Sequence, residues 1–282
     1  MPFNNVFKAT SFKRTGPNIF SRSFDGHRVD YLLPRNLQST TPVLVMHDGM
    51  NVFFSKYAST GDTWLVREGL ATGKIQGDPL VIAVWGEGGT KKYNPRRINE
   101  FLCDDIFEKS PALWETLNPA LTPPTQEPRG NYLIALIADE ILPTVLGALG
   151  IEHSPSRTAL CGCSVAGVSA IYAASKRPDT FGAAFAFSAH WEFGQAELID
   201  ELVRGFDPRM NQLIWSDSGT EALDADSWEL NEYFSKQMVL AGFTPRENLE
   251  TPIFWGTGHH ETFWARRFEY PVNWWLAKIG SK

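Results

Sequence analysis

The sequence has little cysteine and no long run of charge of one sign. Only three cysteines occur among 282 residues, and Cys161 and Cys163 stand too close together to staple a fold and lack metal-ligand partners at suitable spacing. We therefore expect reduced thiols and no metal site. The 26 basic and 32 acidic residues are scattered, which gives a formal net charge of −6 and no basic face suited to nucleic acid.

We expect the sequence to contain no long apolar segment. Residues 1–18 are polar and mixed in charge, unlike a signal peptide, and we find no later stretch of about 18 apolar residues. We expect a cytoplasmic protein whose partner is a small molecule, with neither a membrane nor a nucleic acid as partner. The oligomeric state is not readable from the sequence.

The composition is that of a globular protein. Hydrophobic residues make up 43% and charged residues 21% of the chain, enough to bury a sizeable core. Since single α/β domains often reach this length, we expect residues 1–282 to form one domain. A proline-rich segment near 104–130 breaks regular structure, and we interpret it either as a lid or as a packed connector.

Short runs rich in branched and aromatic residues alternate with helical patterns along the chain. The predicted strands are 29–33, 42–47, 80–85, 158–163, 183–188, 212–216 and 252–255, and the predicted helices are 132–149, 165–176, 226–241 and 262–279. The middle strands are almost continuously apolar, as expected for strands covered on both faces. The pattern predicts a doubly wound α/β fold, with a mostly parallel central sheet and helices on both faces.

One serine has the sequence context of a nucleophile. Ser164 follows the apolar run 158–163 and precedes an apolar-periodic helix, so it lies at a strand-to-helix turn. Small flanking residues let such a turn be sharp: Gly162 meets this need, and Ala166 followed by Gly167 replaces the usual second glycine. A serine that begins a helix also serves commonly as a cap, and this alternative stays open at this point.

A serine hydroxyl needs a neighbouring imidazole to take its proton, and two candidates follow the last predicted strand. His259 and His260 stand after a glycine-rich segment and before a helix, where hydrolases of this kind carry their base. From this context alone either ring qualifies. His27, His47 and His153 lie elsewhere and are interpreted as surface or structural residues.

The acid of a Ser–acid–His chain order is expected between the serine and the histidine, just after a strand. Asp217, Glu221 and Asp224 all lie in that stretch. We favour Asp224 because it lies beyond the turn, from where its side chain can reach the histidine. The alternatives are that Asp224 only caps a helix starting near residue 227, and that Asp217 or Glu221 is the acid.

An oxyanion needs amide donors aimed at it before the reaction starts. Val165, directly after the serine, is one candidate. Gly49 and Met50, after the early strand 42–47, are candidates for the second donor, with Gly49 expected to let the backbone approach the substrate. A plain Asp-Gly turn explains the same residues equally well.

The motifs VLVMHDGMNVF, NPRRINEF, GCSVAG, DSGTEALD and GTGHHETFW occur in this order. Together they resemble, over roughly residues 28–278, the putative esterase family of the α/β-hydrolase fold, which contains enterochelin esterases, feruloyl esterases and relatives of S-formylglutathione hydrolase and the mycolyltransferases. In that family the histidine is followed two residues on by Glu and five on by Trp. This resemblance selects His259, with Glu261 and Trp264, and supports Asp224.

The resemblance also implies a pocket. His190 and Trp191 match a segment that resembles a pocket wall, and Arg97 matches another part of the family pattern. Two departures stand out: Met50 replaces a usual glutamine, and GCSVAG replaces GSSMGG, so the oxyanion loop and the elbow are expected to be retuned.

The resulting hypothesis is a serine hydrolase of carboxylic esters. It would form an acyl-enzyme on Ser164, with His259 as general base and Asp224 as orienting acid, and without a metal or organic cofactor. An acyltransferase of the same fold, and a binding protein that kept the fold and lost catalysis, are the alternatives. Acyl-chain preference and acceptor are not readable from the sequence.

Overall fold

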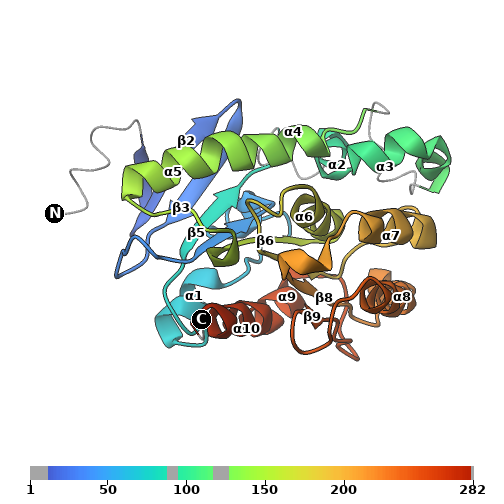
Figure 1. The fold of residues 1–282 in the computed structure, drawn as a ribbon. Helices are drawn as coiled ribbons and strands as arrows, with labels where there is room; N and C mark the ends of the chain where they lie inside the picture. The colour runs from blue at the N-terminus through green and yellow to red at the C-terminus, as the bar shows by residue number, and fades with distance from the viewer. Residues whose placement is uncertain (1–11, 88–94, 117–126, 281–282) are drawn as a thin grey trace.

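The computed structural model describes residues 12–87, 95–116 and 127–280. Its centre is a nine-stranded sheet with the order β1-β2-β3-β5-β4-β6-β7-β8-β9 (Figure 1). The strands are β1 Lys13–Gly16, β2 Ile19–Phe24, β3 His27–Leu32, β4 Val43–Met46, β5 Leu80–Val84, β6 Thr158–Cys163, β7 Ala183–Phe187, β8 Leu213–Ser216 and β9 Leu249–Glu250.

The pairs β1–β2, β2–β3 and β3–β5 are antiparallel. The remaining pairs, from β5 through β4, β6, β7 and β8 to β9, are parallel. Every residue of β4, β5, β6 and β7 is buried, which explains their unbroken apolar sequences. The loops that follow parallel strands meet at one edge, so the segments after β4, β6, β7 and β8 are brought together there. This edge carries the candidate site.

Helices cover both faces of the sheet (Figure 1). One hydrophobic core lies under α4, α5, α6 and α7, and a second core on the opposite face lies under α1, α9 and α10. The helices are α1 Val66–Thr72, α2 Pro95–Phe101, α3 Asp104–Lys109, α4 Gly130–Ala135, α5 Leu142–Leu149, α6 Val165–Lys176, α7 Gln195–Arg204, α8 Ser227–Leu240, α9 Glu261–Arg267 and α10 Glu269–Gly280. The predicted doubly wound α/β class is confirmed.

A continuous helical segment, Gly130–Leu149, joins α4 and α5 through a π-helical stretch, Leu136–Ile141. By length and composition it is apolar enough to span a membrane, with a mean hydropathy of 1.7, so our expectation that no such stretch exists is wrong. Its apolar side chains, including Leu133, Ile137 and Val145, are buried in the core, whereas Asp139 and Glu140 are exposed. This division is that of a core helix with one solvent face.

Three of the expected elements differ in the structure. Residues 252–255 make only an isolated bridge, Ser218 to Ile253, and the last strand is β9 instead. The predicted helix 262–279 is divided at Phe268 into α9 and α10. Within the proline-rich segment, α3 and the 3₁₀ turn Pro111–Thr116 form where a loop was expected, and residues 117–126 of the expected lid lie outside the described residues.

Candidate active site

Ser164 occupies a strained turn between β6 and α6. Its backbone has φ 57° and ψ −131°, a conformation rarely adopted by residues other than glycine, and its side chain makes no capping hydrogen bond to α6. The alternative that this serine acts as a helix cap is therefore wrong. The turn is fixed from both sides, because the Ser164 N–H donates to Phe187 O and the Ser164 carbonyl accepts from the N–H of His190.

The small residues beside the serine permit this turn sterically. A Cβ added at Gly162 would lie 2.2 Å from the Ala166 carbonyl oxygen, a contact that no side chain tolerates. A Cβ at Gly167 would lie 3.2 Å from the Ala186 side chain, so this glycine lets α6 pack closely on β7. Gly162 thus sets the sharpness of the elbow, as its sequence position predicts.

His259 and Asp224 form a hydrogen-bonded pair. His259 Nδ1 lies 2.6 Å from Asp224 Oδ1; the carboxylate is fully buried, and the imidazole is 11% exposed. Burial alone would raise the pKa of Asp224, but hydrogen bonds from His259, Ser188 and the Gly219 N–H outweigh it and hold that pKa below its usual value. When Nδ1 donates to the carboxylate, Nε2 remains available to accept a proton.

No hydrogen bond joins Ser164 Oγ to His259 among the described residues, and such bonds often tighten only when substrate binds. The two residues are nevertheless held in one neighbourhood. The His190 N–H bonds the Ser164 carbonyl at 3.2 Å, and the rings of His190 and His259 have their centroids 6.1 Å apart.

A second layer of polar residues orients Asp224. Ser188 Oγ accepts hydrogen bonds from Arg267 Nη2 at 2.7 Å and Trp264 Nε1 at 3.0 Å, so its own proton is directed to Asp224 Oδ2 at 2.6 Å. Arg267 also forms a buried ion pair with Asp217, 2.8 Å from Oδ1, and Asp217 accepts the Ser188 N–H. The sequence interpretation missed Ser188 and Arg267.

A signal for these two residues exists in the sequence. Arg267 lies three residues after Trp264 on one short helix, and this spacing lets both side chains reach the same atom. Ser188 ends the predicted strand 183–188, directly before the segment that was interpreted as a pocket wall.

The competing acids and the second histidine have other partners. Asp217 is engaged by Arg267, and Glu221 is exposed. The first turn of α8 is preceded by Asp226, so Asp224 is not the cap of that helix. His260 caps α9, because its Nδ1 accepts the Thr262 N–H at 3.2 Å. Geometry therefore brings His259 and Asp224 together and leaves the other candidates outside the pair.

The candidate oxyanion donors lie after two neighbouring strands. Among the described residues, the N–H groups of Val165 and Met50 have no hydrogen-bond acceptor, so both remain free to bind an anion. The explanation given for Gly49 needs correction. A Cβ there would lie 2.4 Å from Trp85 Cδ1 and 2.7 Å from Ala83 backbone atoms, so the glycine permits packing against β5 and not an approach to substrate.

One ion pair and two hydrogen bonds to a carboxylate hold the Met50 loop. The Asp48 carboxylate accepts hydrogen bonds from both Nε and Nη2 of Arg97, and the Asp48 backbone has φ 53°. The Arg97 guanidinium also stacks over the Phe101 ring. Glu261 accepts hydrogen bonds from Asn51 Nδ2 and from Thr60 Oγ1, the latter at 2.9 Å. Arg97 thus braces the candidate oxyanion loop, and Glu261 ties this loop to the segment that carries His259.

The two expected pocket-wall residues have different environments. His190 is 7% exposed; its ring packs edge-on against Phe193 with centroids 4.7 Å apart and lies 6.1 Å from the His259 ring. Trp191 has no exposed surface: its ring stacks on Phe234 at 4.8 Å. The structure therefore places Trp191 in the core and not on a pocket wall.

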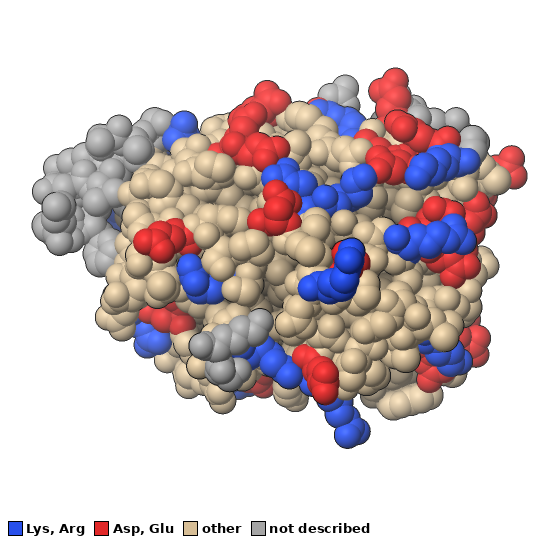
Figure 2. Space-filling model, viewed as in Figure 1, with Lys and Arg blue, Asp and Glu red and all other residues tan. Residues whose placement is uncertain are grey.

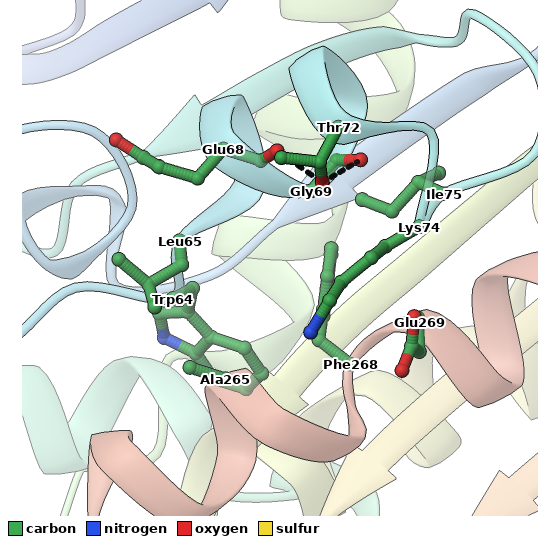
Figure 3. A pocket seen from close by; sticks show the side chains of 10 residues that line it. All are labelled: Trp64, Leu65, Glu68, Gly69, Thr72, Lys74, Ile75, Ala265, Phe268 and Glu269. Carbon is green, nitrogen blue, oxygen red and sulfur yellow. Dashed lines mark hydrogen bonds between the residues drawn. The ribbon is translucent and has the colours of Figure 1, made fainter.

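An apolar cavity of about 250 Å³ lies between α1 and the α9–α10 pair (Figure 3). Trp64 and Phe268 line it, with Lys74 reaching across from the end of α1. Trp64 stacks on Trp264, whose ring packs against His259. The cavity thus lies behind the site, and neither Ser164 nor Met50 lines it.

The three cysteines lie in the hydrophobic cores. Cys103, Cys161 and Cys163 are free and buried, and burial raises the pKa of each. Within the described ranges no group of three or more His, Cys, Asp or Glu side chains is placed to hold a metal ion. On the face drawn in Figure 2, acidic and basic side chains are intermingled.

The fold is that of the α/β-hydrolases. Residues 106–271, more than half of the chain, match the family described as Putative esterase, and the chain belongs to that family. It is accordingly a carboxylic-ester hydrolase acting on a small-molecule ester. The predicted family resemblance is confirmed. No curated protein matches the sequence.

Solved structures with the same fold include several esterases. The chain superposes on the BES protein from Bacillus cereus with a TM-score of 0.66 and 14% identity, covering 93% of this chain and 97% of that one. The enterobactin hydrolase IroE superposes with a TM-score of 0.65 and 18% identity, covering 96% of this chain and 99% of that one. The enterobactin esterase FES from Shigella flexneri superposes with a TM-score of 0.65 and 14% identity, covering 95% of this chain but 61% of FES. These likenesses concern the fold.

Proposed function

We propose that the protein hydrolyses carboxylic esters through an acyl-enzyme on Ser164. The observation that carries this proposal is the His259–Asp224 pair at 2.6 Å, beside a serine held in a strained elbow with its hydroxyl uncapped. A serine, a base and an orienting carboxylate in this chain order are the parts that acyl transfer needs.

In the first half-reaction, Ser164 Oγ attacks the ester carbonyl while its proton moves to His259 Nε2. The buried Asp224 carboxylate stabilises the imidazolium that forms, and the N–H groups of Val165 and Met50 bind the oxyanion. Collapse of the tetrahedral intermediate breaks the ester bond, and the imidazolium gives its proton to the departing alcohol. The acyl group is then bonded to Ser164.

In the second half-reaction, a water gives its proton to His259 and attacks the acyl-enzyme. Its oxygen forms the new carboxylic acid, and the proton returns from the imidazolium to Ser164 Oγ. The free acid and the regenerated serine complete the cycle, and every proton is moved by side chains of this chain. If another hydroxyl replaces water at this step, the same machinery performs acyl transfer.

Rapid mixing with a p-nitrophenyl ester tests the proposal. An acyl-enzyme predicts a burst of p-nitrophenol approaching one equivalent per protein chain when deacylation is the slower step. Ser164→Ala should remove both the burst and the turnover, while Ser169→Ala, a buried serine on the same helix, should keep both. Full turnover by Ser164→Ala would contradict the proposal. Adding alcohols to the assay distinguishes transfer from hydrolysis by the new esters that form.

A further inference from the structure

A basic cleft lies on the antiparallel side of the sheet, apart from the triad. Its volume is about 580 Å³; of the ten described residues that line it, five are basic and none is acidic. β1, β2 and β3 form its floor, and the segment from Phe54 to Tyr57 forms a wall. The basic residues are Lys13, Arg14, Arg22, Arg28 and Lys56.

Strand register places basic and hydroxyl side chains together on one face of the hairpin. Lys13 pairs with Ser21, and Ser23 pairs with Arg28, so these four side chains point to the same side. Lys56 approaches from the wall, with Nζ 4.5 Å from the ring centroid of Tyr57. A ligand in the cleft would meet ammonium groups and serine side chains on one surface, where the Ser21 hydroxyl already donates to the buried Asp30.

Arg28 is fixed beneath the cleft. Its guanidinium lies 4.2 Å from the Trp85 ring centroid and 5.1 Å from that of Tyr57, and its Nε donates to the buried Asp30 at 2.9 Å. Asp30 balances this one cation, so Lys13 and Lys56, both exposed, supply positive charge in excess. Hydrogen bonds from Lys56 and Arg28 lower the pKa of Tyr57, which is the effect expected of these two cations on a group that can become negative.

The cleft opens on the same edge of the sheet as the serine. β3 is antiparallel to β5, so its first residues, His27 and Arg28, lie at the carboxyl end of β5 near Trp85. The wall segment follows the Met50 turn directly in the chain. Three strand-to-strand steps separate β6 from β3 and five separate it from β1, which at roughly 4.8 Å each places the cleft about 14 to 24 Å from Ser164.

We propose that this cleft binds an acidic group of the substrate, so that the enzyme prefers esters carrying a carboxylate about 14 to 24 Å from the scissile carbonyl. The inference rests on the proposed function and assigns a substrate class to the same site. The intermingled charges visible in Figure 2 contrast with this cleft, whose ten described lining residues include no acidic one; the buried Asp30 pairs with Arg28 beneath it. Electrostatic attraction there would orient the ester along the sheet edge towards Ser164.

The test compares esters that differ only in the charge of a distant group. One ester ends in a carboxylate on an arm of about 14 Å or about 24 Å, and its partner of the same length ends in the neutral primary amide. One pair carries the arm on the acyl side of the ester, and another carries it on the alcohol side. Hydrolysis of both pairs is measured by titrating the carboxylic acid that is released. For at least one pair, we expect kcat/KM to be higher for the acid, with a preference that shrinks as salt is added.

The variant Lys13→Gln/Lys56→Gln should lower that acid-to-amide ratio roughly twofold to thirtyfold, the combined range for two exposed charges. Its turnover of the amide ester should not change. Lys236→Gln, an exposed lysine on α8, is the matched control and should keep the wild-type ratio.

The outcomes separate the two proposals. An acid-to-amide ratio near one in the wild type, or a ratio unaltered in the double variant, would overturn the acidic-group proposal while amide esters are still hydrolysed through Ser164. Failure of the wild type to hydrolyse any neutral ester, or full activity of Ser164→Ala, would instead contradict the proposed function.

Discussion

Replacing Asp217 with asparagine separates the carboxylate that supports the fold from the one that supports catalysis. Asp217 has no exposed surface; its Oδ1 lies 2.8 Å from Arg267 and accepts the Ser188 N–H, and its Oδ2 accepts Trp215 Nε1. Asparagine keeps the shape of the side chain but loses the charge and one acceptor. The guanidinium of Arg267, itself 2% exposed, would stay buried without its counter-ion.

The magnitude follows from that unpaired charge. Removing one partner of a buried ion pair costs about 3–5 kcal/mol. Arg267 would keep its bonds to Ser188 and to Thr257 Oγ1, so we expect the lower end, about 3 kcal/mol of unfolding free energy. For a protein of this size that corresponds to a fall in Tm of about 6–12 °C.

The pair itself is not strongly stabilising, because burial raises the pKa of Asp217 against the opposing effect of Arg267. Adding Arg267→Met to Asp217→Asn should therefore recover part of the lost stability. Two single variants whose effects simply add would contradict this coupling.

Asp217→Asn should lose more stability than Asp224→Asn, whereas Asp224→Asn should lose more activity. Asp224→Asn should lower turnover by about 10⁴ with a smaller change in Tm, because its carboxylate acts on His259. Asp217→Asn should retain most of its turnover at a temperature where it is folded. Thermal unfolding followed by circular dichroism and turnover of one activated ester, measured on both variants, suffice. A stable but inactive Asp217→Asn would refute the assignment of roles to these carboxylates.

Three further predictions follow from single residues. Ser188→Ala removes the hydroxyl bonded to Asp224, so kcat should fall about tenfold to a hundredfold with little change in KM; an unchanged kcat would contradict its orienting role. Burial lowers the pKa of His47 to about 4, so between pH 6.5 and 4 the unfolded chain binds more protons and stability should fall by up to about 3 kcal/mol. His47→Leu should flatten that decline in urea unfolding, and an equally steep decline would exclude His47 as its source. Gly162→Ala should cost about 1–3 kcal/mol and most of the activity, because its Cβ would meet Ala166 O; near-normal activity would show that the elbow adapts.

Much of the fold was predictable because its central strands are buried on both faces. The predicted strands 80–85 and 158–163 differ by at most one residue at an end from β5 and β6, whose residues are all apolar or small enough to be buried. β1 and β2 were missed because they are short, partly exposed and rich in polar residues. The division at Phe268 was missed because apolar spacing continues from α9 into α10.

The site was predictable where chemistry imposes a local pattern. Ser164 stands out by its small neighbours, and His259 by its glycine-rich approach. The residues that orient Asp224 carry no such pattern, because Ser188 and Arg267 meet only after β7 and α9 fold against one another. Trp191 was predicted to line a pocket because it follows His190 in the sequence, but its side chain is buried in the core.

Covalent labelling measures the central claim most directly. The protein is treated with a fluorophosphonate, and the modified residue is identified by mass spectrometry of the digested chain. A nucleophile activated by His259 predicts one adduct per chain, on Ser164, with loss of ester hydrolysis in proportion to labelling and no adduct in Ser164→Ala. An adduct on a different serine, or labelling of Ser164 that leaves hydrolysis intact, would contradict the account.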